Sequence, residues 1–341
     1  MKKLLSLVLT LALVLMSASL LASCGEESGP VPIVCGENGL NEICGVATLG
    51  VDYYSLGVKA GDMAADILID GKNASEMKFA TDPAPTLIVN DKVAEEIGFT
   101  IPESVRSRAG NAANSKVTRV DSALTEDGAD FTIGILQLVQ HVALDQCNDG
   151  FIDQLSLRLN AAGKTANILN KNASGEEANN STIANNFVDQ NVDLIYSIAT
   201  SSSQAAVSAA SEKGIPVLFN AVTDPVGAGL VGEGMNVTGV SDINPVKEQI
   251  ELIKELLGKE DVNIGLLYTS SETNSVYQIN IAKDTCNELG ISFTEGTISD
   301  ITELENAMIK LKNAGVDAIY IPTDNVLANG AATVHTFNLG E

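Results

Sequence analysis

The chain has 341 residues, which is enough for two domains, and it carries 44 acidic against 20 basic side chains. The resulting net charge of −24 repels nucleic acid and anionic membrane surfaces. A function that requires binding to either of them is therefore disfavoured. A cationic or zwitterionic ligand is compatible with this charge, although a charge spread so diffusely also serves solubility alone.

Residues 1–24 have the pattern of a secreted lipoprotein. Lys2 and Lys3 precede an apolar run over 4–21, and Leu-Ala-Ser-Cys at 21–24 is similar to the lipobox of bacterial lipoproteins. We expect cleavage before Cys24, lipidation of that cysteine, and a short tether after it. A transmembrane anchor with an incidental cysteine is the alternative, because the apolar run could nearly span a bilayer.

Between residues 31 and 105 the pattern predicts short elements: strands at 31–35, 46–49 and 86–89, and helices at 53–68 and 92–97. The longer helix is indicated by apolar residues spaced three and four apart. No complete series of strand, helix and strand is present, so this segment should not bury both faces of a sheet by itself. Residues 106–130 are polar and without periodicity, which predicts a flexible linker that reaches roughly 25–30 Å.

From residue 131 onward strands and helices alternate, which is typical of a doubly wound parallel sheet. The predicted strands are 131–136, 166–169, 194–199, 215–220, 237–240, 264–268, 291–294 and 318–321. The predicted helices lie around 143–159, 183–188, 204–213, 246–257, 276–289, 304–311 and 325–337. The last helix needs a following parallel strand, and the unused strand at 31–35 could supply it.

Several stretches carry a family resemblance. They are ILQLVQHVALD, YSIATSSSQAA, FNAVTDPVGAGLV, VTGVSD and IPTDNVLA after residue 131, and CGENG and ATLGVDYYSLGVKAGDMAADIL before residue 105. The chain resembles ABC-transporter substrate-binding proteins with the periplasmic-binding-protein type I fold, in the subgroup of lipoproteins that includes tryptophan- and tyrosine-binding members. The family's first part is similar to 131–341 and its last part to 31–105, so the chain looks circularly permuted. A natural permutation and a gene-assembly artefact both remain open.

The resemblance implies an α/β fold of two doubly wound parallel-sheet lobes joined by a three-strand hinge. The expected boundaries are a signal peptide at 1–23, a tether at 24–30, lobe 1 from 51–80 plus 131–241, lobe 2 from 31–50 plus 82–105 plus 242–341, and a linker at 106–130. The strand at 31–35 should join the sheet of 242–341, and the new ends, Pro30 and Glu341, should lie near each other.

Ligands of open α/β sheets bind beyond the carboxyl ends of the strands. The turns there contain no Lys or Arg, which disfavours phosphate or polycarboxylate ligands. The candidate ligand-binding residues are Glu37, Asp52, Tyr53, Gln137, His141, Thr200, Ser201, Ser202, Ser203, Thr223, Asp224, Ser271, Glu272, Asn274, Thr323, Asp324 and Asn325.

These residues suit a zwitterionic amino acid, including one with an aromatic side chain. We expect Glu37 and Asp52 to hold its ammonium group, and Ser202 and Ser203, at a helix start, to hold its carboxylate. Tyr53, His141 and Tyr268 offer flat surfaces to a side chain. Helix capping, turn formation and core packing are the structural alternatives for the same residues.

No cofactor and no metal site is expected, because the two histidines, His141 and His335, belong to no cluster of ligands at metal spacing. Cys35 and Cys44 either pair in an oxidising compartment or remain thiols. No nucleophile and base are paired, so we expect a binding protein and not an enzyme. The expected partners are an ABC permease and ATPase, with the lipid anchor at the outer face of the cytoplasmic membrane or in the periplasm. A ligand-sensing module for a membrane receptor is the alternative, disfavoured because the sequence shows no second membrane span.

Overall fold

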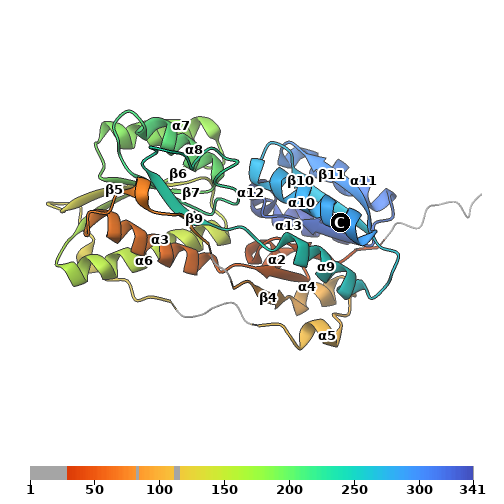
Figure 1. Cartoon of the computed structure of the whole chain (residues 1–341). Helices are drawn as coiled ribbons and strands as arrows, with labels where there is room; N and C mark the ends of the chain where they lie inside the picture. Colours follow the sequence, from red (N-terminus) through yellow and green to blue (C-terminus); the bar gives the residue numbers. More distant parts are fainter. Residues whose placement is uncertain (1–28, 82–83, 111–115, 341) are drawn as a thin grey trace, which may run out of the picture.

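The structure is a computed structural model that describes residues 29–81, 84–110 and 116–340, and it forms two lobes, each built on a six-stranded sheet (Figure 1). The predicted signal peptide at 1–23, Cys24 and all but the end of the tether lie outside the described residues. None of the helices in the described ranges has the length and apolar character needed to cross a bilayer.

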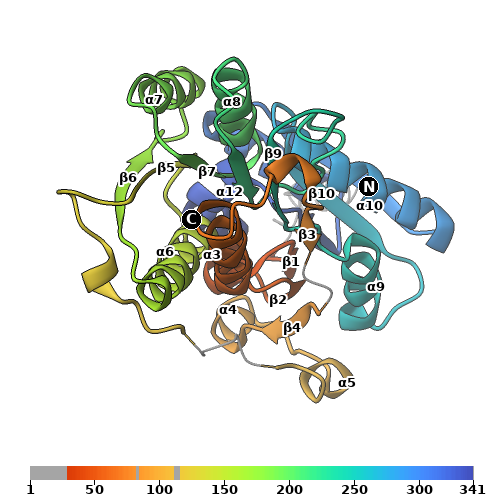
Figure 2. The same cartoon turned by 60° about the vertical axis from the view of Figure 1, so that its left-hand side comes forward.

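Lobe 1 contains a parallel sheet whose strand order is β3-β9-β8-β7-β5-β6. Its strands are β3 (Ala80–Thr81), β9 (Val237–Ser241), β8 (Val217–Asn220), β7 (Leu194–Ile198), β5 (Phe131–Gln137) and β6 (Ala166–Asn172). One face packs against α3 (Tyr53–Leu68) and α6 (Val142–Ala162), and the other packs against α7 (Glu177–Asp189) and α8 (Thr200–Ala210), as Figures 1 and 2 show. Strands β7 and β8 are buried along their whole length, as expected for a parallel sheet covered on both faces.

Lobe 2 contains the second sheet, with the strand order β11-β10-β12-β1-β2-β4. Its strands are β11 (Ser292–Ile298), β10 (Asn263–Thr269), β12 (Ala318–Ile321), β1 (Ile33–Cys35), β2 (Ala47–Gly50) and β4 (Thr86–Val89). The main helices that cover it are α9 (Val246–Leu257), α10 (Thr273–Leu289), α11 (Leu304–Asn313), α12 (Asn325–Asn329), α13 (Ala331–Leu339), α2 (Asn38–Ile43), α4 (Asp91–Glu96) and α5 (Glu103–Arg106).

Strand β1 confirms the predicted position of 31–35. Val34 pairs in parallel with Tyr320 of β12 on one side and with Ala47 of β2 on the other. Beside it, Asn338 of the last helix accepts a hydrogen bond from the Val31 nitrogen at 3.2 Å and donates one to the Val31 carbonyl at 2.9 Å. The last helix therefore lies against the residues that lead into β1, while Glu341 itself is outside the described residues.

Four connections pass between the lobes: from β2 to α3, from β3 to β4, from α5 to β5, and from β9 to α9. Asn244, in the connection from β9 to α9, links it to the connection from β2 to α3 and to lobe 2. Its side chain accepts a hydrogen bond from the Val51 nitrogen at 3.2 Å and donates one to the Thr323 hydroxyl at 3.0 Å.

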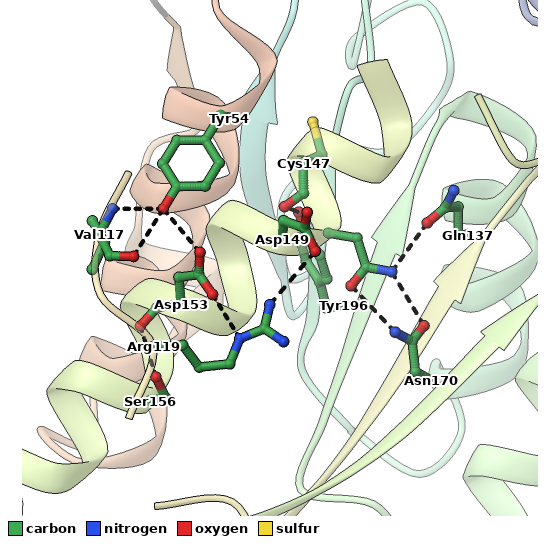
Figure 3. A network of polar contacts seen from close by, with 11 residues as sticks. Tyr54, Val117, Arg119, Gln137, Cys147, Asp149, Asp153, Ser156, Asn170 and Tyr196 are labelled. Carbon is green, nitrogen blue, oxygen red and sulfur yellow. Dashed lines mark hydrogen bonds and ion pairs between the residues drawn. The ribbon is translucent and has the colours of Figure 1, made fainter. Parts of the chain in front are cut away.

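The second half of the predicted linker, 116–124, is docked on lobe 1, so the prediction of a free coil is wrong there. The Tyr54 hydroxyl accepts a hydrogen bond from the Val117 nitrogen at 2.7 Å and donates one to Asp153 at 3.0 Å (Figure 3). Arg119 donates to the same Asp153 carboxylate at 2.6 Å. These polar contacts have no hydrophobic periodicity, which is why the sequence pattern did not reveal them.

Other elements differ from prediction for local reasons. Strand β4 runs antiparallel to β2, so lobe 2 is not purely parallel. The last helix is interrupted at Gly330, where a Cβ atom would overlap the Ile301 side chain. Helix α8 begins at Thr200 instead of Gln204, and a short helix, α2, begins at Asn38 between two of the predicted strands.

The packing of α3 on α6 depends on glycines. A Cβ atom at Gly150 would overlap the backbone oxygen of Tyr54, and one at Gly57 would overlap that of Cys147. We expect Gly150→Ala to lower the free energy of unfolding by on the order of 2 kcal/mol, because a backbone cannot move aside as a side chain can. Urea denaturation measures this. Ser208→Ala, on an exposed position of α8, is the control, and equal stability of the two variants would contradict the close crossing.

Candidate functional site: the cleft between the lobes

Three neighbouring cavities lie where the carboxyl ends of the two sheets face each other, and Asn274 lines all of them. We call them the deep, side and mouth cavities, with volumes of ≈ 10, ≈ 90 and ≈ 610 Å³. Among the described residues that line them, none is Lys or Arg. The deep cavity is lined by Glu37, Tyr53, His141, Leu144, Ala221, Thr223, Asp242, Asn274, Thr323, Asp324, Asn325 and Ala328.

The deep cavity contains buried carboxylates that only neutral groups contact. Glu37 follows β1, and its two oxygens accept hydrogen bonds from the Gly39 and Leu40 nitrogens, which caps α2. Asp242 follows β9 and accepts hydrogen bonds from the Tyr53 hydroxyl at 2.7 Å and the Thr223 hydroxyl at 3.0 Å. Glu37 of lobe 2 and Asp242 of a segment that connects the lobes thus face one small space that neither Lys nor Arg lines.

Burial determines the charge state of these acids. It raises the pKa of Glu37 to about 7, only partly opposed by the two backbone N–H groups. Burial also raises the pKa of Asp242 and of Asp324, which caps α12 and accepts hydrogen bonds from Thr269 and Ser275. A cation placed here would stabilise the ionised carboxylates.

Residues at the boundary of the deep and mouth cavities connect the lobes. The Glu272 carboxylate accepts hydrogen bonds from the Asn325 nitrogen at 2.9 Å and from the Asn274 side chain at 3.1 Å. Its pKa is raised to about 8 by burial and by the negative charge of Asp324. His141, from lobe 1, lies 3.3 Å from the Asn325 side-chain oxygen across the cleft, and burial lowers its pKa. This hydrogen bond joins the two lobes in the present conformation.

The N-terminus of α8 opens toward the mouth and side cavities. Ala199 precedes it with φ 83° and ψ 162°, an uncommon conformation for a residue other than glycine, and supplies no side-chain cap. The Thr200 hydroxyl is buried and has no hydrogen-bond partner among the described residues. The first N–H groups of a helix have no intrahelical partner and carry partial positive charge, so this end favours an anion.

Most of the predicted site residues line these cavities. The deep cavity takes Glu37, Tyr53, His141, Thr223, Asn274, Thr323, Asp324 and Asn325. The mouth cavity adds Thr200, Ser201, Ser271 and Glu272, and the side cavity adds Asp224.

Four predicted residues lie elsewhere because their side chains serve the fold. Gln137 is buried and donates to the Val139 carbonyl and to Asp145. Asp52 caps α3. Ser202 donates to Asn180 at 2.8 Å, and Ser203 donates to the Ala199 carbonyl at 2.8 Å.

Three expected roles lose residues. Asp52, predicted to hold an ammonium group, caps α3. The hydroxyls of Ser202 and Ser203, predicted to hold a carboxylate, are bonded within the protein, whereas the Thr200 hydroxyl at the same helix end has no partner among the described residues. The predicted aromatic wall loses Tyr268, whose ring packs in the lobe 2 core and whose hydroxyl donates to Glu295 at 2.7 Å.

Asp242 is the main residue that sequence reasoning missed. It ends VTGVSD, a stretch already recognised at the crossover between lobes, and its place beyond the carboxyl end of β9 was the available signal. The sequence could not identify the cavity-lining residues Leu144, Ala221 and Ala328, because leucine and alanine are equally common in the hydrophobic core.

The cysteines and histidines of the described ranges form no metal centre. In the described ranges no group of three or more His, Cys, Asp or Glu could hold a metal ion. Cys35 and Cys44 are buried free thiols in this structure. His335 lies outside the cleft and contacts Glu96 at 2.9 Å.

Comparison with known proteins decides the family. The profile described as "ABC transporter substrate binding protein" matches residues 15–113 and 132–339. The chain belongs to this family. The resemblance recognised in the sequence is thereby confirmed.

Individual relatives of this ABC transporter substrate-binding protein are similar over most of its length. It is 34% identical over 246 residues to a tyrosine-binding protein of Clostridioides difficile (strain R20291), which covers 71% of this chain and 69% of the relative. A solved ABC domain in complex with L-Trp from Streptococcus pneumonia is 34% identical, with a TM-score of 0.53 over 61% of this chain and 70% of that one. A conserved domain protein from Vibrio cholerae is 35% identical, with a TM-score of 0.55 over 61% and 71%.

Membership confirms the main expectations about class. The fold is that of two α/β lobes with largely parallel sheets, shared with these substrate-binding proteins. Proteins of this family are binding proteins and not enzymes; they act outside the cytoplasm, where they bind small molecules and ABC permeases.

Proposed function

We propose that this substrate-binding protein captures a zwitterionic amino acid with an apolar or aromatic side chain for an ABC importer. One observation carries the proposal: the same cleft presents buried carboxylates without a cation and, at the start of α8, an uncapped helix end with an unpaired hydroxyl. These two features are complementary to an ammonium group and a carboxylate held on one small molecule.

The ammonium group belongs in the deep cavity. Its volume of ≈ 10 Å³ holds about one water molecule, and an ammonium group is of similar size. There it would donate to Glu37 and Asp242, which contact only neutral donors in the ligand-free protein. Pairing with a cation offsets the cost of burying these two acids.

The carboxylate belongs at α8, where Thr200 and the first N–H groups can donate to it. Phosphorylated or polycarboxylate ligands would lack Arg or Lys partners, since neither residue lines the cleft in the described part of the chain. The names of two relatives, a tyrosine-binding protein and a domain solved with L-Trp, support the same ligand class.

The experiment that tests this proposal is a thermal-shift screen of amino acids, sugars and phosphates. A ligand at 100 times its dissociation constant adds about 2.7 kcal/mol of stability, which a melting curve resolves. We expect one or more amino acids to raise the melting temperature. If a sugar or a phosphate raised it and no amino acid did, the proposal would be refuted.

We propose further that Cys24 is lipidated and holds the protein at the outer face of the cytoplasmic membrane or in the periplasm. The lipobox at 21–24 supports this. Cys24→Ala should abolish incorporation of metabolically supplied palmitate and leave the precursor uncleaved or the protein released. Replacing Ser28, which lies in the tether beyond the lipobox, is the control. Unchanged labelling of the Cys24 variant would contradict the anchor.

We also propose that the chain is a circular permutation of the family order, with the lobe boundaries given above and 106–130 joining the family's two ends. The pairing of β1 between β12 and β2 supports this. The solved relatives each cover 61% of the chain, which is the share that 132–339 alone makes up.

A rebuilt gene tests the permutation. It would join Glu341 to Val31 directly and open the chain within 106–130. We expect the rebuilt protein to bind the same amino acid with similar affinity and stability, because exposed and adjacent ends tolerate permutation. If only the rebuilt protein folds and the present order aggregates, the present order is an assembly artefact. If only the present order folds, the permutation proposal is wrong.

A further inference from the structure

The mouth cavity has an apolar surface formed by both lobes. Leu138 and Val139 line it from the turn between β5 and α6 in lobe 1, and Ile301 and Val326 line it from lobe 2. The other lining residues are polar or glycine. Thr200, where the ligand carboxylate is placed above, lines the same cavity. Asn274 lines both this cavity and the deep cavity, to which the ammonium group is assigned.

Ile301 is held in position although it is 37% exposed. It begins the short 3-10 helix η3 (Ile301–Glu303), and its side chain lies against Gly330, where a Cβ atom would overlap it. The loop around it is braced, because Asp300 accepts a hydrogen bond from the Thr302 nitrogen at 2.8 Å and Glu303 accepts one from Ser299 at 2.7 Å. The fold thus fixes the apolar side chain of Ile301 in the wall of the mouth cavity.

We propose that Ile301 and Val326, facing Leu138 and Val139, form the subsite for the ligand's apolar side chain and determine which amino acids bind tightly. This inference rests on the proposed function and deepens it. The cavity volume of ≈ 610 Å³ exceeds what a single aromatic ring occupies, and ligand pockets of this size are ordinary.

The subsite also links selectivity to lobe closure. A large apolar side chain would touch residues of both lobes, so it would stabilise the closed arrangement by burying surface on each side. A small side chain would reach neither wall and would leave the mouth cavity filled with water. Affinity should therefore increase with the apolar size of the side chain, while the contacts to ammonium and carboxylate remain the same.

Calorimetric titration of two variants with two amino acids tests this subsite. Ile301→Ala and Val326→Ala should each weaken binding of L-tryptophan about tenfold, the effect of lost apolar contacts in a pocket, and change binding of L-alanine by less than twofold. The matched control is Ile309→Ala, an isoleucine of the same lobe that is 48% exposed on α11 and lines none of the three cavities. It should leave both affinities unchanged.

The outcomes separate the two proposals. If wild-type protein binds neither amino acid, nor any other in the thermal-shift screen, the proposed function fails and the subsite fails with it. If wild-type protein binds L-alanine as tightly as L-tryptophan, or if both cavity variants change both affinities by the same factor or not at all, the subsite alone is wrong.

Discussion

Glu37→Gln should weaken binding of the amino acid about a hundredfold. The substitution keeps the shape of the side chain and removes the charge that we assign to the ligand's ammonium group. Removing one partner of a buried charged pair costs about 2–5 kcal/mol, much of it from the charge left unpaired. The free energy of unfolding of the ligand-free protein should fall by only about 1 kcal/mol, because the glutamine amide nitrogen cannot accept the hydrogen bond that one Glu37 oxygen receives from a backbone N–H group. Calorimetric titration measures the loss of affinity.

Glu42→Gln is the matched control for this experiment. Glu42 lies on the same short helix, is exposed, and accepts a hydrogen bond from Asn38 instead of lining the deep cavity. The affinity of the Glu42→Gln variant for the amino acid should stay within twofold of the wild-type value. Equal affinities for the two variants would show that Glu37 does not hold the ammonium group.

Affinity for the amino acid should rise about tenfold per pH unit between pH 5 and pH 7 and then level off. Burial raises the pKa of Glu37 in the ligand-free protein to about 7, so below this pH the carboxyl holds a proton. The ammonium group favours the ionised carboxylate, so the carboxyl must release its proton when the ligand binds. Each unit of rising pH makes this release easier and raises the affinity about tenfold. Above pH 7 the proton is already lost, and the gain ends.

The other titratable groups around Glu37 do not reverse this sign. They are Asp242, Asp324, Tyr53 and His141 around the cavity, Glu42 on α2 and Cys35 on β1. Asp242 and Asp324 also have raised pKa values and would release protons in the same direction. Any proton on His141 would be expelled as well, because a second cation in the cavity is unfavourable.

Titrations in two buffers with different ionisation enthalpies count the protons directly. Near pH 6 the wild-type protein should release close to one proton per ligand bound, and Glu37→Gln should release fewer. An affinity that is constant from pH 5 to pH 7, or that falls as the pH rises, would contradict the assignment of the ammonium group to these carboxylates.

The sequence predicted the fold because hydrophobic periodicity and topology act together. Each lobe is covered on both faces, so its strands are continuous apolar runs such as AIYI at Ala318–Ile321, which the pattern located without error. The missing strand after the last helix was predicted from the rule that a parallel crossover needs one, and β1 occupies that place. Docking of 116–124 could not be predicted, because it combines polar contacts such as that between Arg119 and Asp153 with a few apolar side chains, Val120, Ala123 and Leu124, that follow no clear period.

The candidate site was predictable as a set of turns, although not in the role of each residue. Residues that follow the carboxyl ends of strands meet at one edge, which placed Glu37, Thr223 and Asp324 correctly around the cleft. Whether a hydroxyl in the first turn of α8 faces the ligand or the core depends on the exact start of the helix. The start at Thr200 rotates Ser202 and Ser203 inward and leaves the Thr200 hydroxyl unpaired at the cavity.

Native mass spectrometry of the purified protein, with Glu37→Gln prepared in parallel, tests the central claim most directly. The account predicts that wild-type protein retains a ligand with the mass of an amino acid, and that the variant loses it under the same conditions. Retention of a sugar or a phosphorylated compound by the wild-type protein, or equal retention of an amino acid by both proteins, would contradict the claim that an amino acid binds in this cleft through Glu37.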